Sequence, residues 1–318
     1  MKLVYKEWML AFFLGLVLPG LLLGVAVKRR EVAATVPEST ITEPLPKVSE
    51  DTMDLLLPDG TRQTMDLEDY LVGVVLGEMP ASFETEALKA QAVVARTYTL
   101  KCCAAGVKHG VGTMCAEASC CQAYADPALY GGGEAELQKV RTAVKETAGE
   151  VLIYEGELIE ATYFSCSGGN TEDAVAVWGT DYPYLRSVES PGEETAAHYT
   201  DSVYFTAGEF QQKLGRELEG SPKSWIGFTT YTAGGGVNTI RIGGVEYKGT
   251  EIRTKLGLRS TAFTMSPDAD GITVNTKGYG HRVGMSQYGA DAMALRGCNY
   301  QEILAHYYQG TTLTLFEN

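Results

Sequence analysis

Glu78 occupies a position where a charged side chain is unexpected. In the stretch VVLGEMPASF (74–83) it continues a series of apolar residues at helical spacing, which are Leu67, Tyr70, Leu71, Val74 and Val75. A carboxylate on an apolar face loses hydration, which favours its protonated form and raises its pKa. Such a group can donate a proton at neutral pH and take one back, so Glu78 is a candidate general acid and base. The alternative is a glutamate at a helix end that reaches solvent or pairs with Arg96.

Two Gly-rich segments carry polar side chains that could line a cleft for a sugar. The first, YFSCSGGNT (163–171), contains Tyr163, Ser165, Ser167 and Thr171. The second, GYGHRVGMSQYGA (278–290), contains His281 and Gln287 and leads into a helix. Gly-rich loops can approach ligands closely. The alternatives are an ordinary turn for the first segment and a tight connection with a core histidine for the second. The chain has no G-x-S-x-G elbow, Walker loop or H-E-x-x-H motif.

His109, Cys115 and Cys121 are spaced six residues apart in HGVGTMCAEASCC (109–121). Nitrogen and thiolate ligands at short spacing suit Zn²⁺. Five of the seven cysteines fall between residues 102 and 121, which indicates a local site more than a disulfide framework. The alternatives are free thiols or a disulfide of Cys115 with Cys120 or Cys121.

Local patterns predict the elements that must position these side chains. The Asp59-Gly60 turn signal indicates a hairpin over 53–66, and Asp66 is placed to cap a helix that runs toward Glu78. A second helix is expected over 84–105, closed by Gly106, with Lys89 and Arg96 on nearly the same face. Strand-like runs occur at 150–164, 260–266 and 271–276, and helical patterns at 207–218 and 284–306. Because no βαβ rhythm is present, we expect an α+β fold with a Gly-rich cleft.

The front of the chain differs from the rest. Residues 8–27 hold no charge and are long enough to cross a bilayer as a helix. We expect residues 1–30 to form a cytoplasmic tail and a single transmembrane anchor, residues 31–50 a Pro-containing stalk, and residues 51–318 the catalytic domain. A cleaved signal peptide is the alternative, but the apolar run is long and no A-x-A site follows it. The 318-residue chain has a formal net charge of −14, and its body has no basic stripe, so nucleic acid is not an expected partner.

Four stretches resemble the stage II sporulation protein D family, which is related to the amidase-enhancer domain. They are VVLGEMPASFETEALKAQAVVARTY, SCSGGNT, RTKLGLRSTAF and GYGHRVGMSQYGA, in the family's order over roughly residues 55–315. The resemblance implies a lytic transglycosylase that cuts the bond between N-acetylmuramic acid and N-acetylglucosamine and leaves a 1,6-anhydro end. It implies action on peptidoglycan glycan strands during engulfment in sporulation, after a partner amidase has removed the stem peptides.

The resemblance also assigns roles to single residues. Glu78 matches the glutamate of the E-M-P motif, which is the catalytic acid and base. The residues expected to hold sugar groups or to orient Glu78 are Arg96, Lys89, Tyr163, Ser165, Ser167, Thr171, His281 and Gln287. A zinc site, structural in the first instance, falls on His109, Cys115 and Cys121. The extra Cys120 departs from the family pattern and leaves the fourth ligand open between Cys120 and a water, which would leave room for a catalytic metal.

The expected setting is the cell membrane, with the catalytic domain outside the cytoplasm at the septal or engulfing membrane. The expected partners are a membrane scaffold of the engulfment machinery and the amidase. Lys28, Arg29 and Arg30 oppose this orientation, because positive residues favour the cytoplasmic side. Two other functions stay open at this point: a non-catalytic glycan-binding activator of an amidase, and a hydrolase that uses water as its nucleophile.

Overall fold

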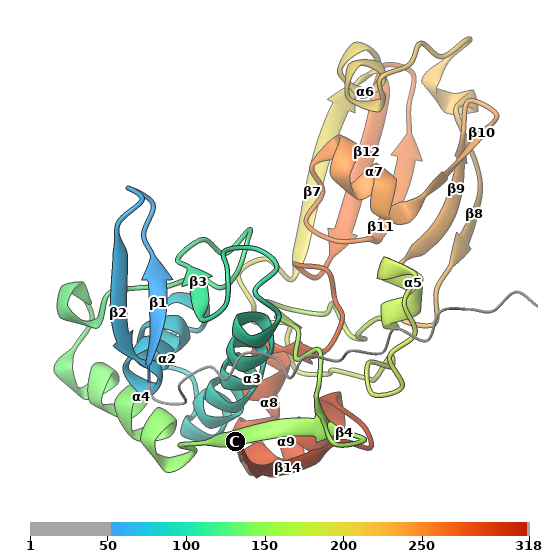
Figure 1. Cartoon of the computed structure of the whole chain (residues 1–318). Coiled ribbons are helices and arrows are strands. Elements are labelled where there is room, and N and C mark those ends of the chain that lie inside the picture. The colour runs from blue at the N-terminus through green and yellow to red at the C-terminus, as the bar shows by residue number, and fades with distance from the viewer. Residues whose placement is uncertain (1–51, 317–318) are drawn as a thin grey trace, which may run out of the picture. The chain divides into compact units, whose positions relative to one another are not determined.

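The computed structural model describes residues 52–316 (Figure 1). The predicted anchor and stalk lie outside the described residues, so both stay predictions. Within residues 52–316, no helix combines the length and the apolar character that a membrane crossing requires.

The chain of described residues starts with the predicted hairpin and two helices. β1 (Thr52–Leu56) pairs antiparallel with β2 (Arg62–Asp66), and β3 (Thr113–Cys115) joins β1 in parallel. The Asp66 side chain caps α2 (Leu67–Glu78) by accepting from the amides of Glu68 and Asp69. α3 (Thr85–Ala105) ends at Gly106, whose φ of 59° suits glycine. These local predictions are confirmed.

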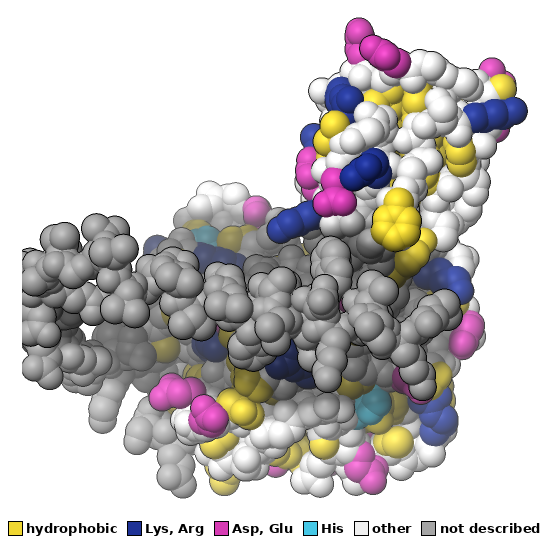
Figure 2. All heavy atoms as spheres, turned by 90° about the vertical axis from the view of Figure 1, so that its right-hand side faces the viewer, with side chains coloured by type: hydrophobic (Ala, Val, Ile, Leu, Met, Phe, Trp, Pro, Cys, Tyr) yellow, Lys and Arg dark blue, Asp and Glu magenta, His cyan; other side chains and the backbone are white. Residues whose placement is uncertain are grey.

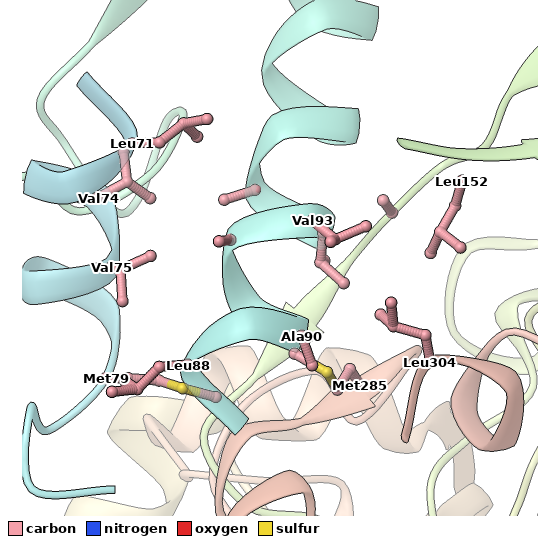
Figure 3. Close-up of a cluster of buried hydrophobic side chains, with 14 of the residues drawn as sticks. Leu71, Val74, Val75, Met79, Leu88, Ala90, Val93, Leu152, Met285 and Leu304 are labelled. Atoms are coloured by element: carbon pink, nitrogen blue, oxygen red, sulfur yellow. The ribbon is translucent and has the colours of Figure 1, made fainter. Parts of the chain in front are cut away.

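The long helix α3 is the centre of the main hydrophobic core. It contacts α2 and the following elements: α4 (Glu134–Glu146), β4 (Glu150–Tyr154), β5 (Glu157–Leu158), α8 (Gln287–Leu295) and α9 (Tyr300–Tyr307). β4 pairs with β5 and with β14 (Thr312–Leu315) in a three-stranded sheet. Figure 3 shows Leu71, Val74 and Val75 of α2 facing α3, with Leu152 and Leu304 on the other side of that helix. Because α3 buries most of its circumference, its sequence is rich in alanine and valine.

A second hydrophobic core lies between residues 200 and 277. One sheet has the order β11 (Ala262–Pro267), β12 (Gly271–Lys277) and β7 (Thr200–Thr206), and the other has the order β10 (Val245–Lys248), β9 (Val237–Ile242) and β8 (Ile226–Tyr231). α6 (Ala207–Leu214) and α7 (Gly249–Leu256) supply Phe210 and Ile252, which are fully buried with Ile272 of β12. With the strands, helices and both cores in view, the expectation of an α+β fold is confirmed.

Short elements bring the two Gly-rich segments together. β6 (Tyr163–Phe164) pairs in parallel with β13 (Met285–Ser286). The other short elements are η1 (Pro127–Leu129), α5 (Ala174–Trp178) and η2 (Pro222–Ser224). β6 is the start of the polar segment 163–171, and β13 lies within the polar segment 278–290. Their pairing therefore brings the two segments together at one site.

A buried ion pair ties three loops to one another. Arg282 Nη1 lies 3.1 Å from Glu172 Oε1, and both side chains are almost fully buried. The remaining Arg282 donors go to the carbonyl oxygens of Ser167 (2.6 Å), Asn170 (2.7 Å) and Gly234 (2.6 Å). Glu172 in turn accepts from the Gly236 amide at 2.9 Å. One guanidinium, whose charge is paired with Glu172, therefore fixes the loops 167–172, 232–236 and 278–284.

Charge is distributed without a dominant sign over the face shown in Figure 2. Acidic and basic side chains are interspersed there, and the described Lys and Arg side chains on that face form no continuous stripe.

Candidate active site

A cleft of about 440 Å³ opens at the C-terminal end of α2. The residues that line it are Glu78, Tyr98, Ala118, Cys120, Cys121, Thr162, Tyr163, Phe164, Ser165, Tyr279, Gly280, His281 and Gln287. They come from α2, α3, the segment after β3 and both Gly-rich segments. Among these lining residues, Glu78 is the one carboxylic acid.

Glu78 is the last residue of α2, and its side chain lines the cleft. Met79 is extended (φ −123°, ψ 144°), and its amide still bonds to the Val75 carbonyl at 3.0 Å. Pro80 then prevents a further helical turn. The helix therefore presents its apolar face to the core along its length and places one carboxylate at its end.

Opposing influences set the protonation of Glu78. Burial is the largest of them and raises the pKa of the carboxyl above its ordinary value. Hydrogen bonds act against it: the Ala123 amide donates to Oε1 at 2.7 Å, and Gln287 Nε2 donates to Oε2 at 3.4 Å. The Tyr163 hydroxyl also lowers the pKa. The net shift is upward, as the sequence pattern predicted. The alternative, a pair of Glu78 with Arg96, is not formed, because Arg96 pairs with Glu68.

Two glycines on α2 let the Ala123 amide reach Glu78. A Cβ on Gly77 would lie 2.9 Å from the Ala123 carbonyl carbon and the Tyr124 nitrogen, and a Cβ on Gly73 would lie 2.1 Å from the Tyr124 ring. The Ala125 amide also bonds to the Gly73 carbonyl at 3.0 Å. Because only glycine permits this approach, the segment 123–125 lies directly against the helix that ends in Glu78.

Tyr163 connects Glu78 to a buried polar network. Its hydroxyl donates to Gln122 Oε1 at 2.9 Å, and Gln122 Nε2 donates to Thr99 at 2.7 Å and to Tyr70 at 3.3 Å. Burial, followed by the nearby Glu78 charge, raises the pKa of Tyr163 well above its ordinary value. Tyr163 therefore keeps its proton, which its hydroxyl donates to Gln122.

His281 forms a neutral wall of the cleft. The Val283 amide donates to Nδ1 at 3.1 Å, which leaves the ring proton on Nε2. Burial, with a contribution from the charge of Arg253, lowers the pKa of His281 to about 4, and a hydrogen bond with the Tyr163 backbone opposes this shift. The ring packs against Phe164 and Trp178, at centroid distances of 5.7 and 5.2 Å. His281 is thus near the cleft as predicted, although it is held uncharged at neutral pH.

Gln287 and Ser165 are placed by the joined Gly-rich segments. Ser286 caps α8 by accepting from the Gly289 amide at 3.2 Å, and Gln287 is the first residue of that helix. The Tyr288 amide bonds to the Ser165 carbonyl at 3.0 Å. Both predicted residues therefore line the cleft with Glu78.

His109, Cys115, Cys120 and Cys121 form a cluster beside the cleft. Their ligand atoms all lie within 4.8 Å of one another, and His109 Nε2 is 3.3 Å from Cys120 Sγ. The three cysteines are free thiols, so the alternative disulfides of Cys115 are not formed. One nitrogen and three sulfurs at this separation fit a tetrahedral divalent metal of the zinc type. Cys120 is part of the cluster although it neighbours Cys121, so four protein ligands are available without a water.

Two predicted binding residues lie away from Glu78. Arg96 is fully buried in a bidentate pair with Glu68 (2.8 and 2.6 Å) and also donates to the Glu150 carbonyl at 3.0 Å. Lys89 pairs with Glu86 and Glu146, each at 2.8 Å. The expectation that these cations hold sugar groups is corrected: an acidic partner on a neighbouring element occupies each of them.

Ser167 and Thr171 also lie inside the protein. Ser167 donates from its hydroxyl to Glu193 at 2.9 Å, and Thr171 accepts from the Val188 amide at 2.8 Å. Neither side chain is accessible to solvent. The expectation that they bind sugar directly is corrected, because their polar groups instead stabilise the loop that carries Ser165.

Four residues of the site region were not predicted from the sequence. Tyr98 and Tyr279 line the cleft, Ala123 supplies the backbone donor to Glu78, and Trp178 is 41% exposed beside His281. A usable signal existed for Ala123: Gly73 and Gly77 are four residues apart on one helix face, which indicates a close approach by another segment. Isolated aromatic residues such as Trp178 offered no such pattern.

Comparison with known proteins places the chain among sporulation proteins. The family model described as Stage II sporulation protein matches residues 60–154. Stage II sporulation protein D of Bacillus subtilis (strain 168) is 44% identical over 260 residues, covering 79% of this chain and 75% of that protein. The Stage II sporulation protein D of Bacillus amyloliquefaciens is 39% identical, covering 92% and 88%. A protein of Bacillus subtilis (strain 168) named Amidase enhancer is 31% identical, covering 77% of this chain and 40% of its own length.

The raised pKa of Glu78 predicts a pH-dependent effect on stability. In the wild type, the free energy of unfolding should fall as pH rises from the unfolded pKa through the raised folded pKa, because the folded state holds its proton longer. Glu78→Gln keeps the acceptor for Ala123 and does not titrate. We therefore expect this variant to be more stable than wild type in urea at about pH 7, with the difference shrinking toward about pH 4. The exposed Glu246→Gln is the control, and an equal difference at both pH values would contradict the burial argument.

Proposed function

The chain belongs to the stage II sporulation protein D family, and we propose that it is a peptidoglycan lytic transglycosylase with Glu78 as catalytic acid and base. The observation that carries the proposal is the presence of one half-buried carboxylic acid in a cleft otherwise lined by neutral groups. Glycosidases that use water or form a glycosyl-enzyme need two carboxylates. One is sufficient when the substrate supplies its own nucleophile.

The proposed reaction uses Glu78 twice. The protonated carboxyl donates its proton to the glycosidic oxygen while the bond from that oxygen to C1 of N-acetylmuramic acid breaks. The resulting carboxylate takes the proton of the muramic acid 6-hydroxyl, whose oxygen forms the new bond to C1. The products are a 1,6-anhydro end and a free N-acetylglucosamine hydroxyl, no water is consumed, and Glu78 is again protonated.

The surrounding groups fit this sequence of proton positions. The Ala123 amide and Gln287 donate to Glu78 and stabilise its charged form, while burial stabilises the neutral form. Tyr163 stays protonated and directs its hydroxyl within the same network. His281 stays neutral, so it adds no charge that would hold Glu78 permanently ionised.

Product analysis tests the proposal directly. We expect the wild type to release 1,6-anhydro fragments from denuded glycan strands. In Glu78→Gln the rate of cleavage should fall by ~10²–10⁴-fold or more, the usual contribution of acid–base catalysis. Mass spectrometry identifies the mechanism, because an anhydro end is one water lighter than a hydrolysed end. Glu246→Gln is the matched control, and glycan binding by Glu78→Gln shows that the fold is intact.

Two outcomes of this test would overturn the proposal. A product one water heavier would assign a hydrolase. No cleavage by wild type, together with retained glycan binding and stimulation of an amidase, would assign the activator function suggested by the relative named Amidase enhancer.

The four-residue cluster is proposed to hold one Zn²⁺ with a structural role. The metal would fix residues 109–121, and the Ala123 amide that bonds Glu78 follows two residues later. Burial raises the pKa of Cys121 to about 12, and the nearby Cys115 and Cys120 sulfurs act in the same direction. A cation bound there would oppose this shift, because it stabilises thiolates.

Metal analysis of purified protein tests the zinc site. We expect about one zinc per chain in wild type and its loss in Cys115→Ser and Cys121→Ser, because closed structural sites need their thiolate ligands. Cys120→Ser should weaken zinc retention against a chelator if Cys120 is the fourth ligand. Cys298→Ser, outside the cluster, should keep the metal. Full activity of a metal-free wild type, purified without chelator under reducing conditions, would rule the site out.

The described domain is proposed to lie outside the cytoplasmic membrane, with a partner amidase and a membrane scaffold at the engulfing membrane. The support is the nature of the proposed substrate, which exists only outside the membrane, together with the apolar run at 8–27. Lys28, Arg29 and Arg30 oppose this orientation, whereas Lys2 and Lys6, which precede the apolar run, favour it. Protease added to protoplasts should digest the domain while a cytoplasmic marker survives; complete protection of both would contradict the orientation.

A further inference from the structure

The motif RTKLGLRSTAF (253–263) has no role in the site described so far. It begins with Arg253 in α7 and contains Arg259 just after that helix (Figure 1). Both arginines are half-buried, and both belong to a chain with 26 basic and 40 acidic residues. In such a chain a half-buried guanidinium normally finds a carboxylate partner.

Arg253 is an exception to that expectation. Five of the described arginines are not exposed, and four of them form ion pairs: Arg96 with Glu68, Arg186 with Asp181, Arg259 with Asp201 and Arg282 with Glu172. Across residues 52–316, Arg253 alone among these five has no carboxylate within 4.0 Å and no side-chain hydrogen bond. Its charge is therefore available to an anion from outside the protein.

Arg253 lies close enough to the cleft for its charge to act on two lining residues. It interacts electrostatically with the Tyr279 hydroxyl and with His281. Arg259 is stacked on the Tyr279 ring, with its guanidinium carbon 5.1 Å from the ring centroid. The Gly280 amide bonds to the Arg259 carbonyl at 3.0 Å, which fixes the motif against the cleft wall.

The two arginines differ in what they can still bind. Arg259 commits its Nε to Asp201 at 3.1 Å and its planar face to Tyr279. The N–H donors of the Arg253 guanidinium are not used by hydrogen bonds within residues 52–316, and their planar arrangement matches a carboxylate in bidentate geometry. Tyr279 is 40% exposed and lines the cleft, so it offers an apolar ring face to a sugar.

We propose that Arg253, supported by Arg259 and Tyr279, binds the lactyl carboxylate of an N-acetylmuramic acid unit in a subsite adjoining the cleft. This inference rests on the proposed function, because it requires a glycan strand in the cleft. In a denuded strand each muramic acid carries a free carboxylate, whereas in a strand with stem peptides the same carbonyl is part of a neutral amide. The subsite therefore distinguishes denuded strands from peptide-bearing ones through a charge that the peptide removes.

Binding measurements in the Glu78→Gln background test the subsite without cleavage. The two probes are denuded disaccharide-repeat oligosaccharides and the same oligosaccharides with their lactyl carboxylates converted to methylamides. We expect tighter binding of the free acid, and loss of about tenfold or more of its affinity in Arg253→Gln, the usual worth of a hydrogen bond to a charged group. The affinity for the methylamide should not change, so the preference should disappear.

Two further variants keep the result interpretable. Arg253→Lys retains the positive charge but not the planar pair of donors, so it should keep part of the preference for the free acid that Arg253→Gln loses. Arg241→Gln removes an exposed arginine outside the cleft and should leave both affinities unchanged. An equal loss for both probes in Arg253→Gln would show a structural role and overturn the inference, as would equal binding of both probes by the parent protein.

The outcomes separate this inference from the proposed function. If the chain cleaves strands to anhydro products but shows no carboxylate preference, only the subsite fails. If neither probe binds and no strand is cleaved, the proposed function itself fails.

Discussion

The contact between Glu78 and the Ala123 amide is the constraint on which the rest of the site depends. It requires the end of α2 and the segment 123–125 to lie closer than any side chain at Gly73 or Gly77 would allow. It also requires the segment to stay in place at its other end, where the cluster of His109, Cys115, Cys120 and Cys121 gathers four ligand atoms. The His–Cys cluster and a helix with two glycines thus act on opposite ends of the same short stretch of chain.

The other wall of the cleft is fixed by a second constraint, the Arg282–Glu172 pair. Arg282 has a φ of 67°, an unusual conformation for a residue with a side chain, and it is followed directly by the β13 region that leads to Gln287. Its donors are distributed over loops from both hydrophobic cores. Removing one partner of such a buried pair typically costs ~3–5 kcal/mol, because the remaining charge is left without compensation. The strained backbone at Arg282 is thus maintained by the interactions of its own side chain.

Sequence patterns predicted what depends on local chemistry. The hairpin, the Asp66 cap, the end of α3 at Gly106 and the apolar setting of Glu78 were all visible, because each is determined by neighbours in sequence. The residues of the His–Cys cluster were visible for the same reason. Arg96, Ser167 and Thr171 were misjudged because their partners, such as Glu68 and Glu193, are distant in sequence. Lys89 was misjudged although one of its two partners, Glu86, lies on the same helix. A polar residue type shows that a partner is needed but does not show whether that partner is a substrate or the protein's own interior.

The proposed chemistry requires Glu78 to exist in both protonation states within one turnover, and the structure contains groups that favour each state. Burial alone would favour the neutral acid and leave a weak tendency to give up the proton. Hydrogen bonds from Ala123 and Gln287 alone would favour the carboxylate and leave too little acid at neutral pH. Because burial is the larger influence while both donors persist, the pKa of Glu78 is raised, which increases the share of the acid form, and the donors stabilise the carboxylate once the proton has left. The neutral His281 preserves this balance, since a charged imidazole at the same wall would shift it toward the carboxylate.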